Sequence, residues 1–111
     1  MIFLTLEEKL YREQLQMKIY FVYILKCKDD SYYTGITSEL ENRVLEHQEG
    51  KHRNSYTFNR RPVELVFYCE FTNVELAIET EKKLKKWSRA KKEAIINNEF
   101  EKLPNLAKKK F

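Results

Sequence analysis

Glu81 is the residue whose place in the sequence most clearly suggests chemistry. On a helical wheel of about 100° per residue for the helix expected after Thr72, Glu81 falls inside the apolar arc. The arc is formed by Val74, Ala77, Ile78 and Leu84. A carboxylate there loses much of its hydration energy unless a cation, a metal ion or a hydrogen-bond donor replaces the water. We therefore expect Glu81 either to hold a divalent metal ion or to pair with Lys85, one turn onward; the wheel leaves both open.

A cation and an imidazole point toward the core from an earlier predicted helix. Arg43 and His47 are four residues apart and lie within or beside the arc set by Leu40 and Val44. Taken singly, His47 is better explained as a core histidine, and Arg43 is better explained as a side chain whose stem lies along apolar surface. Together with Glu81, the two favour a catalytic cluster.

Two tyrosines complete the cluster from the strands of one predicted hairpin. Tyr23 and Tyr33 each carry a hydroxyl that needs a partner if it is buried. Gly35 interrupts a strand otherwise rich in side chains, which indicates either a bulge or a place where a ligand or another backbone approaches closely. A carboxylate, a guanidinium, an imidazole and two hydroxyls are thus expected to converge on one sheet face.

Residues 51–61 form a polar loop that interleaves cations with aromatic rings and hydroxyls. Lysine and arginine side chains contact phosphates, and an aromatic ring such as that of Tyr56 stacks on a base or ribose. The alternative is a solvated basic loop. With Gly35, the candidate nucleic-acid contacts are Lys51, Arg53, Tyr56, Thr57, Arg60 and Arg61.

These residues need a small antiparallel sheet flanked by helices to bring them together. Strands are predicted at residues 19–25, in the centre of the sheet, at 32–36 after a turn over 28–31, and at 63–71, where the odd positions are apolar and indicate one buried face. The order β-β-α-β-α-α predicts an α+β domain over residues 17–100. Residues 1–16 are expected to be an extension and residues 101–111 a basic tail.

Capping signals predict where the helices begin and end. The extension is expected to be helical from Thr5 to about Gln16. The three helices of the domain are expected to run from the N-cap Ser38 to Gly50, from the cap Thr72 to about Trp87, and from the cap Ser88 to about Phe100, before Pro104.

Composition limits the partners and the compartment. A chain of 111 residues with a net charge of +4 fits one domain with a modest bias toward polyanions. The two cysteines match neither a disulfide framework nor a zinc site, which favours buried thiols in a reducing cytoplasm. With no signal-peptide pattern and no apolar run of membrane-spanning length, we expect a cytoplasmic protein with no membrane attachment.

Two short segments resemble a known signature. Phe21-Val22-Tyr23 and Tyr33-Thr34-Gly35 are similar to the two signature segments of the GIY-YIG nuclease superfamily. Residues 20–96 resemble its small bacterial single-domain, YhbQ-like branch, which is similar to the N-terminal nuclease domain of UvrC. The stretches at residues 33–37, 60–63 and 88–92 carry this finer resemblance.

The resemblance implies a DNA phosphodiesterase whose catalytic residues are Tyr23, Tyr33, Arg43, His47 and Glu81. It implies one Mg²⁺ or Mn²⁺ on Glu81, phosphate charge met by Arg43, and a role for Tyr23 in deprotonating water. The expected activity is metal-dependent endonuclease cleavage of DNA in repair or processing, on branched or single-stranded substrates, with RNA left open. The alternatives are a nucleic-acid-binding module with little turnover, or a protein-interaction domain that uses the N-terminal extension.

Overall fold

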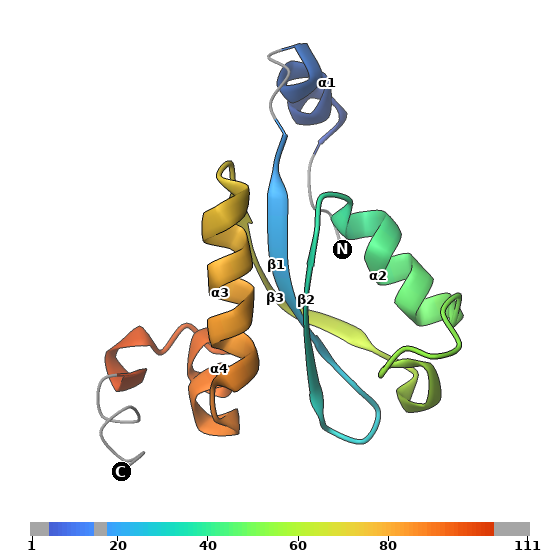
Figure 1. The fold of residues 1–111 in the computed structure, drawn as a ribbon, viewed down its shortest axis with the longest axis vertical. Helices are drawn as coiled ribbons and strands as arrows, with labels where there is room; N and C mark the ends of the chain where they lie inside the picture. The colour runs from blue at the N-terminus through green and yellow to red at the C-terminus, as the bar shows by residue number, and fades with distance from the viewer. Residues whose placement is uncertain (1–4, 15–17, 104–111) are drawn as a thin grey trace.

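Three antiparallel strands form the sheet of this protein. The computed structural model describes residues 5–14 and 18–103. β1 (Tyr20–Lys26) lies between β2 (Tyr32–Thr37) and β3 (Glu64–Phe71), so the first strand is central, as predicted. β1 and β2 form the expected hairpin (Figure 1). The α+β class is confirmed.

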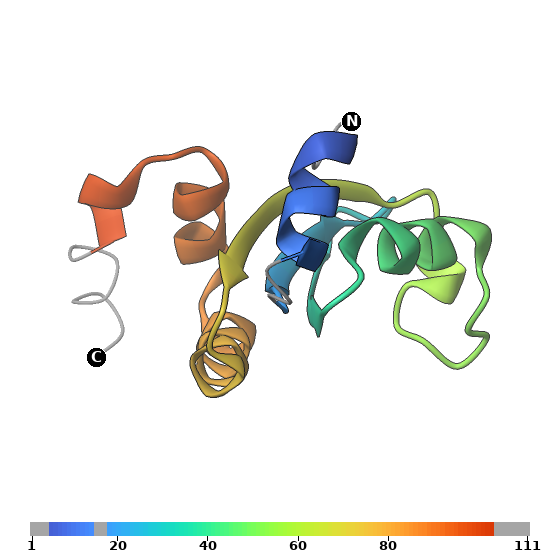
Figure 2. The same ribbon diagram turned by 90° about the horizontal axis from the view of Figure 1, so that it is seen from above.

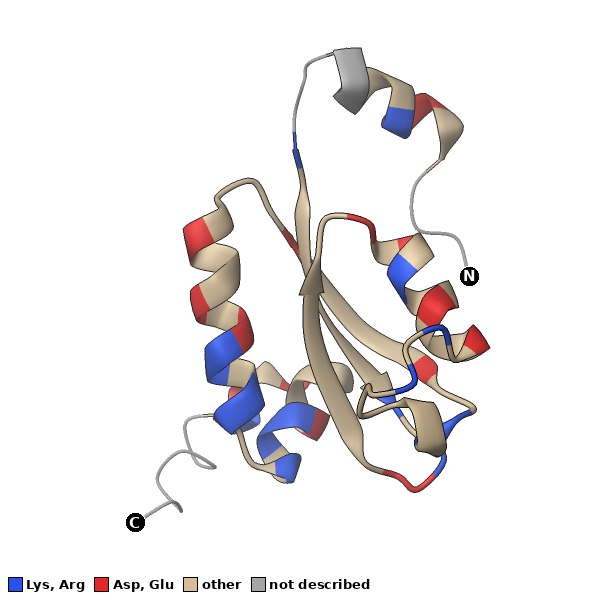
Figure 3. Ribbon diagram, turned by 45° about the vertical axis from the view of Figure 1, so that its right-hand side comes forward, with Lys and Arg blue, Asp and Glu red and all other residues tan. Residues whose placement is uncertain are grey.

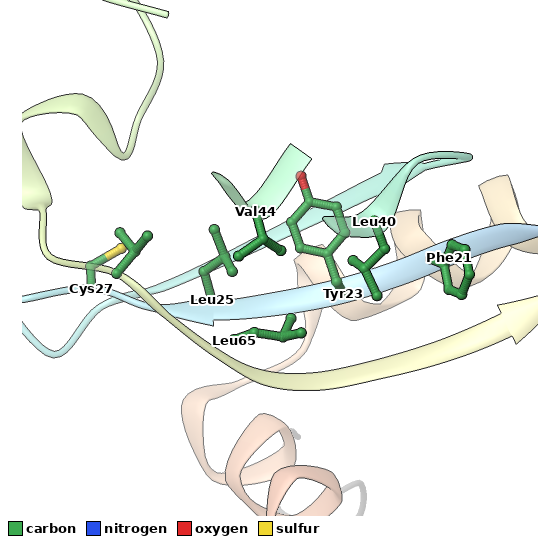
Figure 4. Close-up of a cluster of buried hydrophobic side chains, with 8 residues drawn as sticks. Phe21, Tyr23, Leu25, Cys27, Leu40, Val44 and Leu65 are labelled. Atoms are coloured by element: carbon green, nitrogen blue, oxygen red, sulfur yellow. The ribbon is translucent and has the colours of Figure 1, made fainter. Parts of the chain in front are cut away.

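Helices cover both faces of the sheet, and this buries β1 from Phe21 to Leu25. α2 (Leu40–Glu49) packs over one face, while α3 (Val74–Lys86) and α4 (Arg89–Ile96) pack over the other (Figures 1 and 2). Tyr23 and Leu25 lie in the cluster beneath α2 (Figure 4), whereas Val22 and Ile24 lie in the cluster beneath α3 and α4. Alternate residues of a strand point to opposite faces, so an unbroken apolar run is what a strand covered on both sides requires.

A β-bulge in β3 corrects the expectation of one buried face. Ile24 pairs with Phe67 but the next residue, Leu25, pairs with Leu65, so Val66 is an extra residue in β3. One additional residue reverses which face the following side chains occupy. Leu65 therefore packs beneath α2, while Phe67 packs on the α3 and α4 side.

Two helix caps differ from those predicted. Asn73, not Thr72, caps α3, because its side chain accepts the backbone N–H of Leu76 at 3.0 Å. Glu39, not Ser38, is the N-cap residue of α2, and its side chain makes no capping bond.

The predicted end of α2 and the predicted start of α4 are confirmed, but α4 is shorter than predicted. Gly50 ends α2 in the left-handed conformation at φ 72°, which a glycine adopts without steric cost. Ser88 caps α4 through the backbone N–H of Lys91. α4 ends at Ile96, and a 3₁₀ helix, η2 (Phe100–Lys102), follows it, so the predicted continuation to Phe100 is wrong.

The N-terminal extension forms a separate short helix, α1 (Leu6–Gln14). Thr5 Oγ1 accepts the backbone N–H of Glu8 at 3.1 Å, as the capping pattern predicts. Lys9 pairs with Glu41 of α2 at 3.1 Å. The predicted end near Gln16 and the closing Pro104 lie outside the described residues. Among the residues described, no helix has both the length and the apolar character needed to cross a membrane.

Candidate active site

A buried row of hydrogen-bonding groups joins β1, α2 and the loop before β3. The Tyr23 hydroxyl lies 3.1 Å from Nε2 of His47. On the other side of the ring, Nδ1 of His47 lies 2.7 Å from Oγ1 of Thr57, which is 3.2 Å from Oγ of Ser55. Tyr23 and Thr57 are fully buried, and His47 is 5% exposed. We call Tyr23, His47, Thr57 and Ser55 the relay.

Local packing explains why the relay forms. Tyr23 is paired with Gly35 across the hairpin, and a Cβ at Gly35 would lie 2.4 Å from the Tyr23 hydroxyl oxygen. The close approach predicted at Gly35 is therefore made by the Tyr23 ring, and the expected nucleic-acid contact of this buried glycine is corrected. His47 follows Val44 by about one turn, which places both on the inner face of α2.

Burial sets the protonation of the relay. It raises the pKa of the Tyr23 hydroxyl well above its ordinary range, and Tyr33 adds to this while Arg43 opposes it. Burial also lowers the pKa of His47 below 6.5, with a further contribution from the charge of Arg43. At neutral pH, Tyr23 is therefore a neutral hydroxyl and His47 a neutral imidazole, which has one donor and one acceptor nitrogen.

Aromatic rings lead from the relay to the surface. The Tyr33 ring centre lies 5.1 Å from that of His47 and 6.2 Å from that of Tyr23. The ring of Tyr56 is nearly parallel to that of Tyr33, with centres 6.1 Å apart, and the guanidinium of Arg60 lies 3.9 Å from the Tyr56 centre. Tyr33 is half-buried and Tyr56 is exposed, so a ligand at the surface meets these two rings before it meets Tyr23.

Arg43 brings a positive charge to the surface beside the relay. Its side chain is 43% exposed, and its Nε lies 3.3 Å from a carboxylate oxygen of Glu46. Its charge acts on both Tyr23 and His47, which places the guanidinium close to their polar atoms. An exposed guanidinium next to a hydroxyl and an imidazole is suited to binding a phosphate.

Glu81 is sheltered and paired with a cation. Its side chain is 12% exposed, and Lys85 Nζ lies 2.9 Å from Oε2. Of the two partners that the sequence left open, the structure shows Lys85. Because α3 covers the opposite face of the sheet from α2, the expected convergence on one sheet face is wrong. Lys85 and Tyr33 line one hollow at the edge of β2, and the pKa of Lys85 is raised first by Glu81 and further by Tyr33, so the ion pair lies next to the aromatic row.

The chemistry of Glu81 fits a hard divalent cation. The residues described contain no group of three histidine, cysteine or acidic side chains that could enclose a metal ion. Mg²⁺, however, keeps several waters and binds through one or two carboxylates together with substrate phosphates. A single sheltered carboxylate can serve as a ligand of that kind, although Lys85 competes for one of its oxygens.

The elements that carry this site lie within the region matched by a known protein family. The family described as the GIY-YIG catalytic domain matches residues 19–94, which span all three strands and nearly all of α4. This chain belongs to the GIY-YIG family. A GIY-YIG domain is a nuclease-like scaffold, and it includes every element that supplies the relay, Arg43 and Glu81.

Known relatives of this GIY-YIG protein belong to the UPF0213 family. The chain is 46% identical over 77 residues to the UPF0213 protein YazA of Bacillus subtilis, covering 69% of this chain and 77% of the relative. It is 42% identical over 80 residues to a UPF0213 protein of Natronomonas pharaonis, covering 72% and 93%. The solution NMR structure of the UPF0213 protein BH0048 from Bacillus halodurans is 40% identical, covers 71% of this chain and 83% of that one, and has a TM-score of 0.48.

The predicted nucleic-acid loop of the GIY-YIG domain contains both surface and internal residues. Lys51, which pairs with Glu46 at 3.3 Å, and Arg53 are exposed. Arg60 bonds Asp29 at 3.1 Å and the Tyr56 carbonyl at 2.7 Å.

Two predicted contacts in this loop point inward. Thr57 is fully buried against His47, so its expected contact with nucleic acid is wrong. Arg61 lies over the Phe58 ring at 4.7 Å and donates to the Phe58 carbonyl at 2.9 Å, at the start of the 3₁₀ helix η1 (Phe58–Arg60). Its guanidinium also packs against Gly50, so Arg61 supports the loop.

Sequence reasoning missed Thr57 as the partner of the histidine and Ser55 as the partner of Thr57. A hydroxyl in a basic loop carries no signal that it will fold back onto a helix ten residues earlier. The capping and periodicity patterns that located His47 describe one helix at a time.

Proposed function

We propose that this protein is a divalent-metal-dependent endonuclease that hydrolyses phosphodiester bonds of DNA, in repair or processing. The observation that carries the proposal is the hydrogen bond between Tyr23 and His47, buried directly behind the half-exposed Tyr33 and the exposed Arg43. This pairs an internal proton acceptor with a phosphate-binding surface. The finer resemblance to the YhbQ-like branch supports the same activity.

The roles of the side chains follow from their exposure. Tyr23 is too deeply buried to touch a substrate, so Tyr33 and Arg43 are the groups that meet the phosphate and the attacking water. The Arg43 guanidinium stabilises charge that grows on the non-bridging oxygens. The proton of the water passes through the tyrosine hydroxyls to Nε2 of His47, as the bond from phosphorus to water oxygen forms and that to the leaving oxygen breaks.

Glu81 would hold the metal ion. A bound Mg²⁺ or Mn²⁺ supplies Lewis-acid stabilisation of the phosphate and of the leaving oxygen. The work of the chain is to keep the Glu81 carboxylate sheltered next to Tyr33, so that its charge is little screened by solvent.

The distribution of charge supports a path for the nucleic-acid strand. Lysine and arginine segments of α3 and α4 lie on one side of β2, and those of the loop over residues 51–61 lie on the other (Figure 3). β2 is an edge strand, and Tyr33 lies on it between the two basic regions. A nucleic-acid strand that contacts both basic regions therefore passes the candidate active site.

A cleavage assay with matched variants tests the activity. Wild type, Glu81→Gln and the exposed control Glu79→Gln are compared on single-stranded, duplex, flapped and branched DNA and on RNA, with Mg²⁺, Mn²⁺ or chelator. We expect metal-dependent cleavage of DNA by wild type and Glu79→Gln, and a loss of about 10²-fold or more in Glu81→Gln. Cleavage that persists in Glu81→Gln, or in chelator, removes the assignment of the metal to Glu81.

The ion pair between Glu81 and Lys85 favours a second candidate, a nucleic-acid-binding module with little turnover. In that protein the Lys85 ammonium stays where the metal ion would bind. Salt-dependent binding of DNA or RNA with no cleavage on any substrate in either metal would establish the binding module and exclude the nuclease.

A further inference from the structure

A hollow of about 280 Å³ lies at the free edge of β2, beside the relay. Its walls come from β2, α3, α4 and the loop before η1, and they are formed by Tyr32, Tyr33, Thr34, Tyr56, Lys85 and Lys92. This volume is near the lower end for ligand pockets, so it suits one small unit rather than a folded segment. Lys85 and Tyr33 connect it to the site described above.

Lys92 gives the hollow a cation without an acidic partner. Lys92 is half-buried on α4, and burial lowers the pKa of its ammonium. It forms no ion pair with any acidic side chain in the described ranges 5–14 and 18–103, whereas Lys85 is paired with Glu81. A half-buried ammonium that has lost part of its hydration gains most from an anionic ligand.

Thr34 adds a hydroxyl that lacks a partner. It is 3% exposed, and within the described part of the chain its Oγ1 is the one buried side-chain oxygen or nitrogen without a hydrogen bond. Buried hydroxyls are nearly always paired, so this exception requires an explanation. A group in the hollow can supply the partner after Thr34 turns to another staggered rotamer about its Cα–Cβ bond.

The aromatic wall of the hollow fits a base. Tyr56 is 42% exposed, its ring is nearly parallel to that of Tyr33, with 23° between the two planes, and the Arg60 guanidinium lies 3.9 Å from its centre. Exposed tyrosine rings stack on bases without regard to sequence, while a cation nearby holds the phosphate. A cation, a free hydroxyl and a stacking ring together match the parts of one nucleotide.

We infer that the hollow binds one nucleotide unit of the nucleic-acid strand, adjacent to the phosphate at the candidate active site. Lys92 and the Thr34 hydroxyl hold its phosphate, and its base lies against Tyr56. The inference rests on the proposed function because it takes a nucleic acid as the ligand. It does not depend on any catalytic step.

Binding without cleavage tests the hollow. A short fluorescently labelled oligothymidine is titrated in chelator against wild type, Lys92→Met, Thr34→Val and the control Lys82→Met, an exposed lysine of α3 that does not line the hollow. We expect Lys92→Met to weaken binding about tenfold and to reduce the dependence of log Kd on log salt by about 0.7, the value for one phosphate of a single strand. Lys82→Met should change the affinity less than about twofold.

Thr34→Val separates binding from folding. Since it removes an unpaired hydroxyl at nearly constant volume, it should leave the protein at least as stable in urea while weakening oligonucleotide binding severalfold. In addition, thymidine 5′-monophosphate should shift the Thr34 backbone amide in NMR spectra, and thymidine should shift it much less.

The outcomes distinguish this inference from the proposed function. Equal affinities for Lys92→Met and Lys82→Met, or an unshifted Thr34 amide, overturn the nucleotide subsite whatever the cleavage assay shows. Binding that depends on Lys92, without cleavage in Mg²⁺ or Mn²⁺, keeps the subsite and overturns the nuclease. Should Lys92→Met fail to fold, Lys92→Gln and the NMR titration of wild type decide the question.

Discussion

Oγ1 of Thr57 lies 2.7 Å from Nδ1 of His47, and this contact ties the loop before β3 to the inner face of α2. The partner of one ring nitrogen determines what the other can do. If Nδ1–H donates a hydrogen bond to Thr57, Nε2 accepts a hydrogen bond from the Tyr23 hydroxyl. If Thr57 instead donates to Nδ1, Nε2–H donates to the Tyr23 oxygen. Because Thr57 is fully buried, solvent does not replace it in either arrangement.

We predict that Thr57→Val lowers both stability and activity, while Thr57→Ser retains most of both. Valine keeps the volume but leaves Nδ1 of the buried His47 without its partner, at a cost of about 1–3 kcal/mol. Urea unfolding measures the stability, and the cleavage rate as a function of pH measures the effect on His47. Equal stability and equal pH profiles for Thr57→Val and wild type would show that the contact does not orient the histidine.

The free energy of unfolding should fall as the pH drops from about 7 to about 5. In the folded protein the pKa of His47 is lowered from its ordinary 6.5. At a pH between the lowered pKa and 6.5, the unfolded chain therefore binds a proton at this histidine that the folded chain does not bind. Stability is therefore complete above 6.5 and decreases below it.

Two variants isolate the contribution of His47. The pKa values of Asp29 and Glu46 lie below their ordinary 3.8 and 4.5, so the stability that these carboxylates contribute is lost mainly below this window. Urea unfolding of His47→Gln should lose most of the pH dependence. The exposed control His52→Gln should keep most of it, because burial and the charge of Arg43 contribute more than His52 to the lowered pKa of His47. A slope that is unchanged in His47→Gln would contradict the prediction.

Gly35→Ala should destabilise the protein through Tyr23. The new Cβ would lie 2.4 Å from the tyrosine oxygen and 2.5 Å from Cζ, and such overpacking costs about 1–3 kcal/mol. Tyr23→Phe removes the nearest atom, so the double variant should lose less stability than the sum of the single losses. Thermal or urea unfolding of wild type, the two single variants and the double variant measures this double-mutant cycle. Strictly additive losses of stability would show that the alanine Cβ does not clash with the Tyr23 hydroxyl.

Lys85→Met should increase the affinity for Mn²⁺. The substitution frees Oε2 of Glu81 from the ammonium 2.9 Å away and leaves the carboxylate with no neutralising partner on its own helix turn. We expect several times tighter binding of Mn²⁺, measured by electron paramagnetic resonance of the free ion, and a larger thermal stabilisation by Mn²⁺ than in wild type. Lys83→Met is the control. Weaker binding in Lys85→Met than in Lys83→Met would indicate that Glu81 is not the metal ligand.

Replacement of Arg53 should affect DNA binding but not stability, whereas replacement of Arg61 should mainly affect stability. Arg53 is exposed, so Arg53→Ala should leave stability unchanged and reduce the salt dependence of DNA binding by roughly one phosphate contact. Arg61→Ala should lower the free energy of unfolding with less effect on that slope, because the Arg61 side chain packs against Phe58 and Gly50. Arg60→Ala should weaken binding partly by releasing Tyr56. A salt dependence that falls as far in Arg61→Ala as in Arg53→Ala would show that Arg61 binds a phosphate instead of supporting the loop.

The extent of sequence-based prediction is clearest along the strands. The unbroken apolar run at β1 predicted a central strand buried on both faces, because only such a strand tolerates apolar residues at both odd and even positions. The same alternation rule failed in β3, where one extra residue at Val66 moved the later side chains to the other face. A bulge is a property of two paired strands, so no single-strand pattern encodes it.

The candidate site divides in the same way. Local periodicity identified the inward positions of His47 on α2 and of the sheltered Glu81 on α3, since a helix fixes the direction of every side chain relative to its axis. The choice between a metal ion and Lys85 beside Glu81 was left open because the wheel places Lys85 near the same arc but contains no information about a bound ion.

The sequence by itself determined the strand order, the approximate positions of the helices and the inward direction of Tyr23, His47 and Glu81, because these depend on patterns repeated within a few residues. Only the tertiary structure decided that Tyr23 is sealed behind Tyr33, that Thr57 turns inward to His47, and that Thr34 and Lys92 meet in one hollow. Each of these depends on how segments distant in the chain pack against one another, and burial and pKa values follow from that packing.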